Sequence, residues 1–539
     1  MSGVIIAFLS IISLLTGYKF YGRKIEKLFD VNPNNKTPSY YNYDGIDYIP
    51  AKNWLILFGH HFASIAGAGP ILGPVIACFY FGWLPGILWI VLGTIFIGGV
   101  HDLSSLLASI REGGKSIGEV ANKVMGKRVK ILFSIFVWFA LILVVSVFAA
   151  ATAKTLISEP KIVIPTFSLI LIAIFTGILI YRVKFNQFLA TIIGIALLVF
   201  SIYLGNKFPV SLNLNNPLKI WILILLLYAG IASIIPVNIL LQPRDYLSSF
   251  ILFFSLIYGL IGLILTNPKI QSPAFTKFST ENGPLWPMMF VIIACGAISG
   301  FHSLISSGTT SKQIENEKHA KIIGYGAMVL EAVLATVALL SVCAGLSRVE
   351  YGIFLKEKGW IVTFANGFGK ITERLLENKI GFTIAVISLN AFVMTTLDSA
   401  TRITRYITEE IFGDSFGVKI FKKRVISTLL ILLLALSLAF GSWQKIWPIF
   451  GASNQLVAAL VLIIVSCFLL SKGKKIKFTL IPAIFMLLTT ISALLLKIKD
   501  FYISKNFTLF IVGILLILLA IFVVYEAIRF FKKSHVKFQ

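Results

Sequence analysis

The stretch that decides the fold is Phe58-Gly-His-His-Phe-Ala-Ser-Ile-Ala-Gly-Ala-Gly-Pro-Ile-Leu-Gly-Pro74. It lies in an apolar run, residues 53–80, that is long enough for a helix to cross roughly 30 Å of membrane hydrocarbon. Glycines relax the backbone and prolines lack an amide donor, so their density here predicts a broken membrane helix. A half-helix that starts near Pro70 would direct free amide groups and a positive dipole end at an anionic substrate. The simpler alternative is a kink, or close helix packing through small residues.

The rest of the chain is as apolar as this stretch. Of its 539 residues 57% are hydrophobic and 13% are charged, and the mean hydropathy is +0.90. This composition predicts an all-α integral membrane protein. The four cysteines lie inside apolar runs without paired spacing, and we interpret them as packing residues. Hydropathy predicts about 15 transmembrane helices, over 2–20, 53–80, 83–110, 131–157, 163–181, 187–205, 218–241, 246–266, 287–308, 320–346, 379–400, 424–441, 449–471, 478–497 and 507–530.

The formal net charge of +25 has a membrane explanation. Lys and Arg gather in alternate loops, such as 111–130 and 401–424, while the loops between them are sparse in charge except for 347–378, whose mixed charge predicts a surface helix on the outer face. Cytoplasmic loops are rich in Lys and Arg and meet anionic lipid, so we expect a cytoplasmic C-terminus and an outer N-terminus. The charge therefore predicts lipid contact and no nucleic-acid partner. The first apolar run is followed by Lys19 and Arg23, the reverse of a secretory signal, so we expect it to remain as an anchor.

A second interruption occurs in 228–246, where Gly230, Pro236 and Asn238 break an apolar run. Counting from 53–80, this span is the sixth, so the two interrupted spans enter from opposite faces of the membrane. That order predicts two five-helix repeats related by inversion, whose discontinuous first helices meet at mid-membrane. The predicted organisation has three parts: 1–52, an outside-to-inside anchor helix and a cytoplasmic loop; 53–400, a transport core of ten helices; and 401–539, accessory helices.

The predicted substrate site combines the first break with polar groups of two other spans. Its members are glycine-rich backbone positions and short polar side chains: Gly67, Ala68, Gly69, Pro70, Ser233, Asn238, Ser299 and His302.

Ionisable side chains inside the predicted spans are the candidates for ion coupling. Four of the six histidines lie within such spans: His60, His61, His101 and His302. A histidine exchanges a proton near neutral pH, and a buried one beside a carboxylate is a natural relay member. Asp102 and Asp398 are the carboxylates best placed for this role. Alternatively, Arg402, one turn after Asp398, neutralises it in a fixed ion pair.

The sequence leaves two further kinds of site possible, a Na⁺ site and a metal site. Ser306, Ser307 and the threonines that follow offer hydroxyls of the kind that hold Na⁺, or else they cap their own helix backbone. A metal site at His61, His101 and His302 is the other alternative, because these side chains could converge. No resident cofactor is expected beyond H⁺ or Na⁺ as the coupling ion. The sequence contains none of the common nucleophile, nucleotide or metalloprotease motifs, so we expect no enzymatic activity.

Several motifs together resemble the carbon starvation protein A family. They are Leu57–Pro74, Gln242-Pro-Arg-Asp-Tyr-Leu247, Ile293-Ala-Cys-Gly-Ala-Ile-Ser-Gly-Phe-His-Ser-Leu-Ile-Ser-Ser-Gly-Thr-Thr310, Gly324-Tyr-Gly-Ala-Met328 and Trp447-Pro-Ile-Phe-Gly-Ala-Ser-Asn-Gln-Leu456. The resemblance extends from about residue 19 to 470. It implies an importer of the prokaryotic inner membrane, for peptides in some members and pyruvate in others, with a leucine-transporter-like inverted core. His101 stands where the family usually has Gln, so the resemblance does not define its role.

These features predict a secondary active transporter. We expect it to import small carboxylate-bearing nutrients, peptides or pyruvate, by alternating access as a symporter with H⁺ or Na⁺. The alternatives are a membrane-embedded metal-dependent enzyme or metal-binding protein that uses the intramembrane histidines, and a passive channel. The oligomeric state is not indicated by the sequence.

Overall fold

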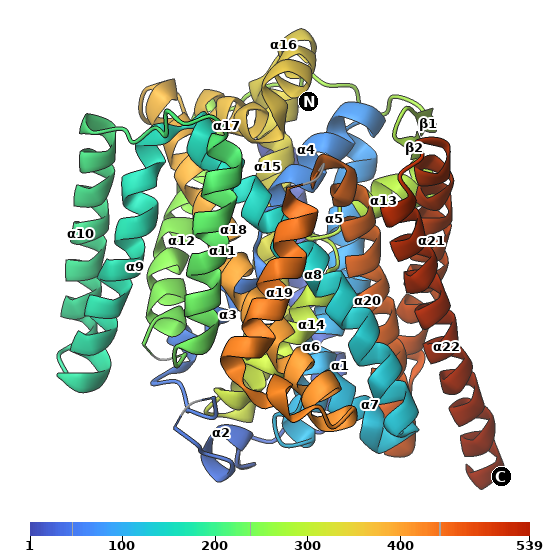
Figure 1. Ribbon diagram of the computed structural model, residues 1–539. Coiled ribbons are helices and arrows are strands. Elements are labelled where there is room, and N and C mark those ends of the chain that lie inside the picture. Colours follow the sequence, from blue (N-terminus) through green and yellow to red (C-terminus); the bar gives the residue numbers. More distant parts are fainter. Residues whose placement is uncertain (46, 238, 441–442, 539) are drawn as a thin grey trace.

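The computed structural model describes residues 1–45, 47–237, 239–440 and 443–538, with the side chains of 181, 443–448 and 534–538 left out. The chain forms a bundle of helices that run between two faces (Figure 1). The N-terminus lies at one of them, the N-terminal face, together with α16, α17 and the short strands β1 and β2. The C-terminus lies at the other, the C-terminal face, together with α2 and α7.

The helices of the first half are α1 (Gly3–Leu28), α2 (Pro38–Tyr41), α3 (Trp54–Ile65), α4 (Gly69–Phe81), α5 (Trp83–Gly93), α6 (Gly99–Arg111), α7 (Ile117–Met125), α8 (Lys127–Ser158), α9 (Val163–Gly177), α10 (Gln187–Lys207), α11 (Pro217–Ile234) and α12 (Leu241–Thr266). The second half contains β1 (Ser279–Thr280), β2 (Gly283–Pro284), α13 (Phe290–Ile292), α14 (Gly300–Gly308), α15 (Ala327–Gly345), α16 (Arg348–Ile353), α17 (Gly359–Ile371), α18 (Asn378–Thr408), α19 (Arg424–Ala439), α20 (Trp443–Ser471), α21 (Lys477–Ile503) and α22 (Phe507–Phe538). β1 and β2 pair antiparallel in a small hairpin.

Among the described residues, 12 helices are long and apolar enough to span a membrane, or up to 13 if α3 and α4 count as one span. This establishes a mostly helical, multi-pass chain. Two of the segments predicted from hydropathy do not meet that length: α19 has 16 residues, and 287–308 is divided into short helical pieces. The prediction of about 15 spans counted both of these segments.

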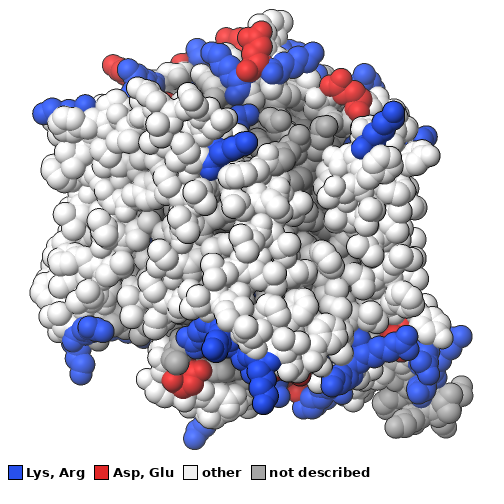
Figure 2. Space-filling view, viewed as in Figure 1, with Lys and Arg blue, Asp and Glu red and all other residues white. Residues whose placement is uncertain are grey.

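Charged side chains are distributed as a membrane requires. On the side of the molecule shown in Figure 2, Lys, Arg, Asp and Glu gather at the two faces and leave a nearly uncharged belt between them. Large apolar side chains such as Leu171, Phe188 and Leu433 are more than half exposed. Apolar surface of this extent is stable only against lipid, so the belt marks the part of the protein inside the membrane.

The first predicted break is confirmed in position. Together, α3 and α4 have the length and apolar composition of one membrane span, with a bend of 44° between Ile65 and Gly69. α4 begins at Gly69, with Pro70 in its first turn, where proline costs no helical hydrogen bond. Pro74 lies inside α4.

The second break differs from the prediction. α11 ends at Ile234 and α12 begins at Leu241, so 235–240 joins two separate helices. The chain instead unwinds between α13 and α14, from Ile293 to Ser299, where Gly296 adopts a φ of +88°. Glycine adopts such a conformation at little cost, because it has no Cβ.

The elements that follow the two unwound segments occur in the same order. Beyond the half-helices α4 and α14, each is followed by a helix that contains a π-helical turn, Thr94–Gly98 or Ile322–Gly326, then by short helices and a long one. The short helices are α7 in the first case and α16 and α17 in the second, and the two sets lie at opposite faces (Figure 1). The long helices, α8 and α18, contact one another inside the bundle.

Candidate functional site

The two unwound segments meet inside the bundle. A Cβ built on Gly69 would lie 2.6 Å from Cβ of Cys295, and one on Gly73 would lie 2.5 Å from the carbonyl oxygen of Ile292. A Cβ built on Gly296 would lie 3.4 Å from Cα of Pro70. Distances below 3.0 Å leave no room for a side chain, so glycine at 69 and 73 permits this close approach. The glycine-rich stretch therefore serves to pack one broken helix against another.

Two half-helices start at this meeting point. α4 begins at Gly69 and α14 begins at Gly300, with Ser299 as the residue before it. The first amide groups of a helix have no partner within that helix, and they place a partial positive charge there. Asn454 satisfies part of the α14 end, since its Oδ1 accepts from the amide of Phe301 at 2.9 Å and its Nδ2 donates to Ser299 Oγ at 2.9 Å. The pair of helix ends forms an anion-favouring region within the apolar belt.

Cavities approach this region from both faces. One, of about 180 Å³, is lined by Gly69 and Cys295 at depth and by Trp360 and Lys497 farther out. The other, of about 240 Å³, is lined by Ser307 and Gly308 of α14 together with residues near the C-terminal face, including Tyr48, Lys312 and Glu410. The unwound segment 293–299 contributes to the lining of the first cavity, and α14 contributes to that of the second.

A cluster of ionisable side chains lies beside α14. Asp102 of α6 is fully buried, and its two oxygens lie 2.7 Å from Nδ1 of His101 and 2.8 Å from Nδ1 of His302. Nε2 of His302 in turn lies 3.3 Å from Oε2 of Glu331, on α15. The structure thus brings together three of the predicted residues, His101, Asp102 and His302. His61 is bonded elsewhere, through Nδ1 to the Thr310 hydroxyl at 2.8 Å.

A second buried network connects α3, α11, α12 and α18. Asp245 accepts from Nη2 of Arg244 at 2.6 Å and lies 2.9 Å from Nδ1 of His60. Arg244 also forms two hydrogen bonds with Asp398, the one from Nη2 being 3.0 Å long. Tyr228 donates to Asp398 at 2.8 Å. Arg244, Asp245 and Asp398 are each at most 1% exposed, so we call this group the Arg244 network, with members His60, Tyr228, Arg244, Asp245 and Asp398.

The alternative prediction, that Arg402 neutralises Asp398 in a fixed ion pair, is wrong. Arg402 donates through Nη2 to the carbonyl oxygens of Ala232 and Ile235, at the end of α11, and the guanidinium beside Asp398 is that of Arg244. Arg402 therefore fastens the end of α11 to α18, and Asp398 belongs to the Arg244 network.

The other predicted residues have separate surroundings. Ser233 donates to the carbonyl of Gly230 at 2.9 Å and contacts Thr428 of α19, away from the meeting point. Ser307 donates to the carbonyl of Ser303 within its own helix, at 2.8 Å. The hydroxyl of Ser306 is buried and has no hydrogen-bond partner among the described residues. Asn238 lies outside the described residues.

Sequence reasoning missed four members of these networks: Tyr228, Arg244, Asp245 and Glu331. A signal for Glu331 existed, since it is a lone carboxylate in the apolar run 327–345, and such residues are rare in membrane helices without a function. The signal for Arg244 and Asp245 was weaker, because hydropathy placed them in a connection between two spans.

Comparison with known proteins defines the family. The family model described as carbon starvation protein CstA matches residues 2–353 and 347–493. The chain belongs to this family. A peptide transporter CstA of Bacillus subtilis is 32% identical, with 94% of this chain and 92% of the relative covered. The pyruvate/proton symporter BtsT of Escherichia coli is 30% identical, with 92% and 82% covered.

The relatives of this CstA-family chain also include a peptide transporter CstA of Campylobacter jejuni, 31% identical over 93% of this chain and 81% of the relative. Among solved structures, the manganese transporter of Eremococcus coleocola resembles it with TM-scores of 0.55 for a variant and 0.52 for a complex with an aromatic bis-isothiourea compound. Each match covers 90% of this chain and at least 98% of the other, at 13% identity. The likeness shows a shared fold.

Proposed function

We propose that this CstA-family chain is a secondary active transporter that imports small carboxylate-bearing nutrients, peptides or pyruvate, by alternating access. The observation that carries the proposal is the meeting of two unwound segments, 66–68 and 293–299, between cavities that approach from opposite faces. An apolar bundle that served only as an anchor would gain nothing from such breaks, which cost helical hydrogen bonds.

The preference for a carboxylate follows from the helix ends. Gly69 and Gly300 each start a helix at the meeting point, and two positive dipole ends there favour an anionic group. The 180 Å³ cavity is also lined by Lys497, whose charge is partly offset by an ion pair with Asp500 at 3.0 Å. Relatives named as peptide transporters and as a pyruvate/proton symporter agree with such a substrate.

We propose protons as the coupling ion and the Arg244 network as their site. Two carboxylates, Asp245 and Asp398, face one guanidinium, that of Arg244. The buried network therefore holds one uncompensated negative charge, which one bound proton would neutralise. Burying a net charge is costly, so proton binding stabilises the network, and coupling arises if only one transport state retains the proton.

We propose an inverted repeat of five helices in each unit. One unit starts at the α3–α4 span and the other at 285–308, and each continues through a π-helical turn, a surface helix and a long helix. Six further spans separate the two starts, namely α5–α6, α8, α9, α10, α11 and α12. With the first unit's own starting span added to these six, the second unit starts an odd number of spans after the first. Corresponding helices of the two units therefore cross the membrane in opposite directions. In this arrangement the core extends to about residue 471, past the boundary at 400 predicted from hydropathy.

The orientation follows from charge. Lys and Arg dominate the C-terminal face in Figure 2, where α2 and α7 also lie. Positive loops remain in the cytoplasm, so we propose a cytoplasmic C-terminus, an outer N-terminus and an inner-membrane location.

Uptake into proteoliposomes tests the proposal. Purified chain is reconstituted, and labelled pyruvate or dialanine is supplied under a proton gradient, a Na⁺ gradient, or neither. We expect accumulation above the outside concentration with the proton gradient, and weak competition by pyruvamide, which lacks the carboxylate. Uptake that only equilibrates under every gradient would contradict active transport. Accumulation driven by Na⁺ alone would leave transport standing and refute the proton assignment.

A further inference from the structure

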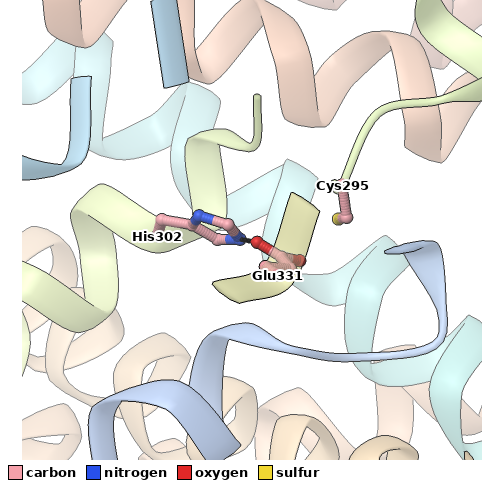
Figure 3. Close-up of side chains that lie close together, drawn as sticks. All are labelled: Cys295, His302 and Glu331. Atoms are coloured by element: carbon pink, nitrogen blue, oxygen red, sulfur yellow. Dashed lines mark ion pairs between the residues drawn. The ribbon is translucent and has the colours of Figure 1, made fainter. Parts of the chain in front are cut away.

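Cys295, His302 and Glu331 converge at the meeting point of the broken helices. Cys295 lies in the unwound segment, His302 on α14 and Glu331 on α15. Figure 3 shows the imidazole and the carboxylate pointing toward one another, with the thiol nearby. One ligand atom from each residue lies within 4.8 Å of the others. The exposed fraction is 6% for Cys295 and 0% for His302 and Glu331.

The cluster contains polar atoms that the protein leaves unsatisfied. Apart from a backbone contact with Gly296 and the approach of His302, the carboxylate of Glu331 has no partner among the described residues, and Nε2 of His302 faces only this carboxylate and Cys295. Buried polar atoms are seldom left in this state, because the loss of hydration costs about 1–3 kcal/mol for each. The cluster therefore needs a further positive group, which either a proton or a bound metal ion could supply.

The tautomer of His302 indicates the charge of that group. Nδ1 of His302 lies 2.8 Å from Oδ2 of Asp102, and a carboxylate oxygen can only accept, so Nδ1 carries a hydrogen. In the neutral imidazole, Nε2 then carries a lone pair and no hydrogen, and it lies 3.3 Å from Oε2 of Glu331. Two electron-rich atoms at this distance require a cation between them.

The third side chain distinguishes a metal ion from a proton. Cys295 also interacts with His302, and its thiolate would be a strong ligand for a divalent transition metal, which a shared proton does not require. Asn454 Nδ2 lies 3.7 Å from the sulfur in a position to donate to it, which stabilises the deprotonated form. A divalent ion also offsets the two negative charges of a thiolate and Glu331.

The geometry suits zinc. Zinc bonds of about 2.0–2.3 Å place the ligand atoms of a tetrahedral site roughly 3.3–3.8 Å apart, and the His302–Glu331 distance of 3.3 Å falls in this range. Cys295 needs a shift of about 1 Å at most, which the non-helical segment 293–299 permits. The contact between His302 and Asp102 is the carboxylate–histidine arrangement that orients metal-bound imidazoles.

We propose that Cys295, His302 and Glu331 bind a divalent transition metal ion, Zn²⁺ in preference to Mg²⁺ or Ca²⁺. Three protein ligands leave a fourth position for water or another small ligand, and the 180 Å³ cavity that reaches Cys295 provides a route of entry. The bound ion ties the unwound segment to α14 and α15. The proposed metal site shares the meeting point and the 180 Å³ cavity with the proposed substrate site, but metal binding is measured without transport, so either proposal can fail while the other stands.

Cobalt spectroscopy on the intact chain tests the site. Detergent-purified protein is stripped with a chelator and titrated with Co²⁺, which reports thiolate ligation by an intense near-ultraviolet band and tetrahedral geometry by visible bands. We expect one equivalent per chain, displacement by Zn²⁺, and no displacement by Mg²⁺ at the same concentration. The absence of the band, with bound metal far below one equivalent, would overturn the proposal and leave a proton shared by His302 and Glu331 only.

Two variants locate the ion. Cys295→Ser should abolish the thiolate band and weaken binding at least tenfold, and Glu331→Gln should weaken binding while the thiolate band persists at high Co²⁺. Cys467→Ser, a buried cysteine on α20, is the matched control and should bind as the unmodified chain does. An unchanged band in Cys295→Ser would overturn the assignment. Because the titration of the unmodified chain needs no variant, misfolding of either variant leaves the proposal testable.

Discussion

The charge imbalance of the Arg244 network leads to a quantitative prediction for Asp245→Asn. The unmodified network has two carboxylates and one guanidinium, so it needs one proton to be neutral. In D245N one carboxylate faces one guanidinium, and neutrality needs no proton. The variant should therefore transport its substrate without taking up a proton.

The size of the effect follows from one proton per substrate. At zero membrane potential, a gradient of one pH unit supplies about 1.4 kcal/mol for each proton, which corresponds to roughly tenfold accumulation of a carboxylate substrate. The unmodified chain should reach about this ratio, and D245N should approach a ratio of about one. Accumulation of labelled pyruvate or dialanine in proteoliposomes, with the potential clamped by valinomycin and equal K⁺, measures both values.

Three controls make this test decisive. Exchange of substrate between equal pools needs no gradient, so D245N should retain it, and this shows that the variant is folded and binds. Asp245→Glu keeps the charge and should accumulate substrate. Asp414→Asn removes a carboxylate that is 59% exposed and should behave as the unmodified chain. If D245N exchanges normally and still accumulates substrate tenfold, the Arg244 network is not the proton site.

Three other predictions follow from the packing and the ion pairs. Gly73→Ala forces a Cβ to within 2.5 Å of the Ile292 carbonyl oxygen, so we expect the free energy of unfolding to fall by about 1–3 kcal/mol. The initial rate of uptake should fall at least tenfold. Gly352→Ala is the control, because its Cβ would lie 3.5 Å from Phe79, and it should leave uptake unchanged. Arg244→Met leaves two buried carboxylates without their cation, so the unfolding free energy should fall by about 3–5 kcal/mol; a thermal midpoint equal to that of the unmodified chain would contradict the ion pairing. Burial would raise the pKa of Glu119, but hydrogen bonds from Lys130 and Asn122 outweigh it and lower this pKa. The ionised carboxylate of Glu119 therefore stabilises the fold at pH values above the ordinary Glu pKa, and this stabilisation is lost as the pH falls through the lowered pKa. Glu119→Gln should be less stable than the unmodified chain at pH 7 and equally stable in acid. Thermal unfolding measured across pH tests this.

Local sequence was sufficient for the first break and insufficient for the second. The α3–α4 bend follows from Gly67, Gly69 and Pro70, whose effect on the backbone does not depend on the rest of the fold. At 228–246 the same reasoning was misled, because Pro236 serves equally well in a connection between two helices. The segment 293–299 has glycine but no proline, and its unwinding depends on contact with α4, which the sequence does not display.

The site was predictable to a similar degree. Histidines and carboxylates rarely occur in apolar runs without a partner, and the structure does pair two of the predicted residues, His302 and Asp102. Which carboxylate meets which cation depends on tertiary contacts, because Arg244 and Asp398 are separated by 154 residues. Arg402 was closer in sequence to Asp398, but its guanidinium is directed at the carbonyls of α11.

The two buried clusters are joined by α3, the first half of the broken span. His60 and His61 are adjacent, so their side chains leave the helix about 100° apart. His60 lies against Asp245 of the Arg244 network, and His61 lies against Thr310, which follows α14. A shift of α3 when the Arg244 network takes up a proton would therefore act on the C-terminal end of α14, whose other end carries His302 and the meeting point of the breaks. Because α3 ends at Ile65 and the chain is non-helical up to Gly69, the proposed alternating access would use this break to move α3 without α4.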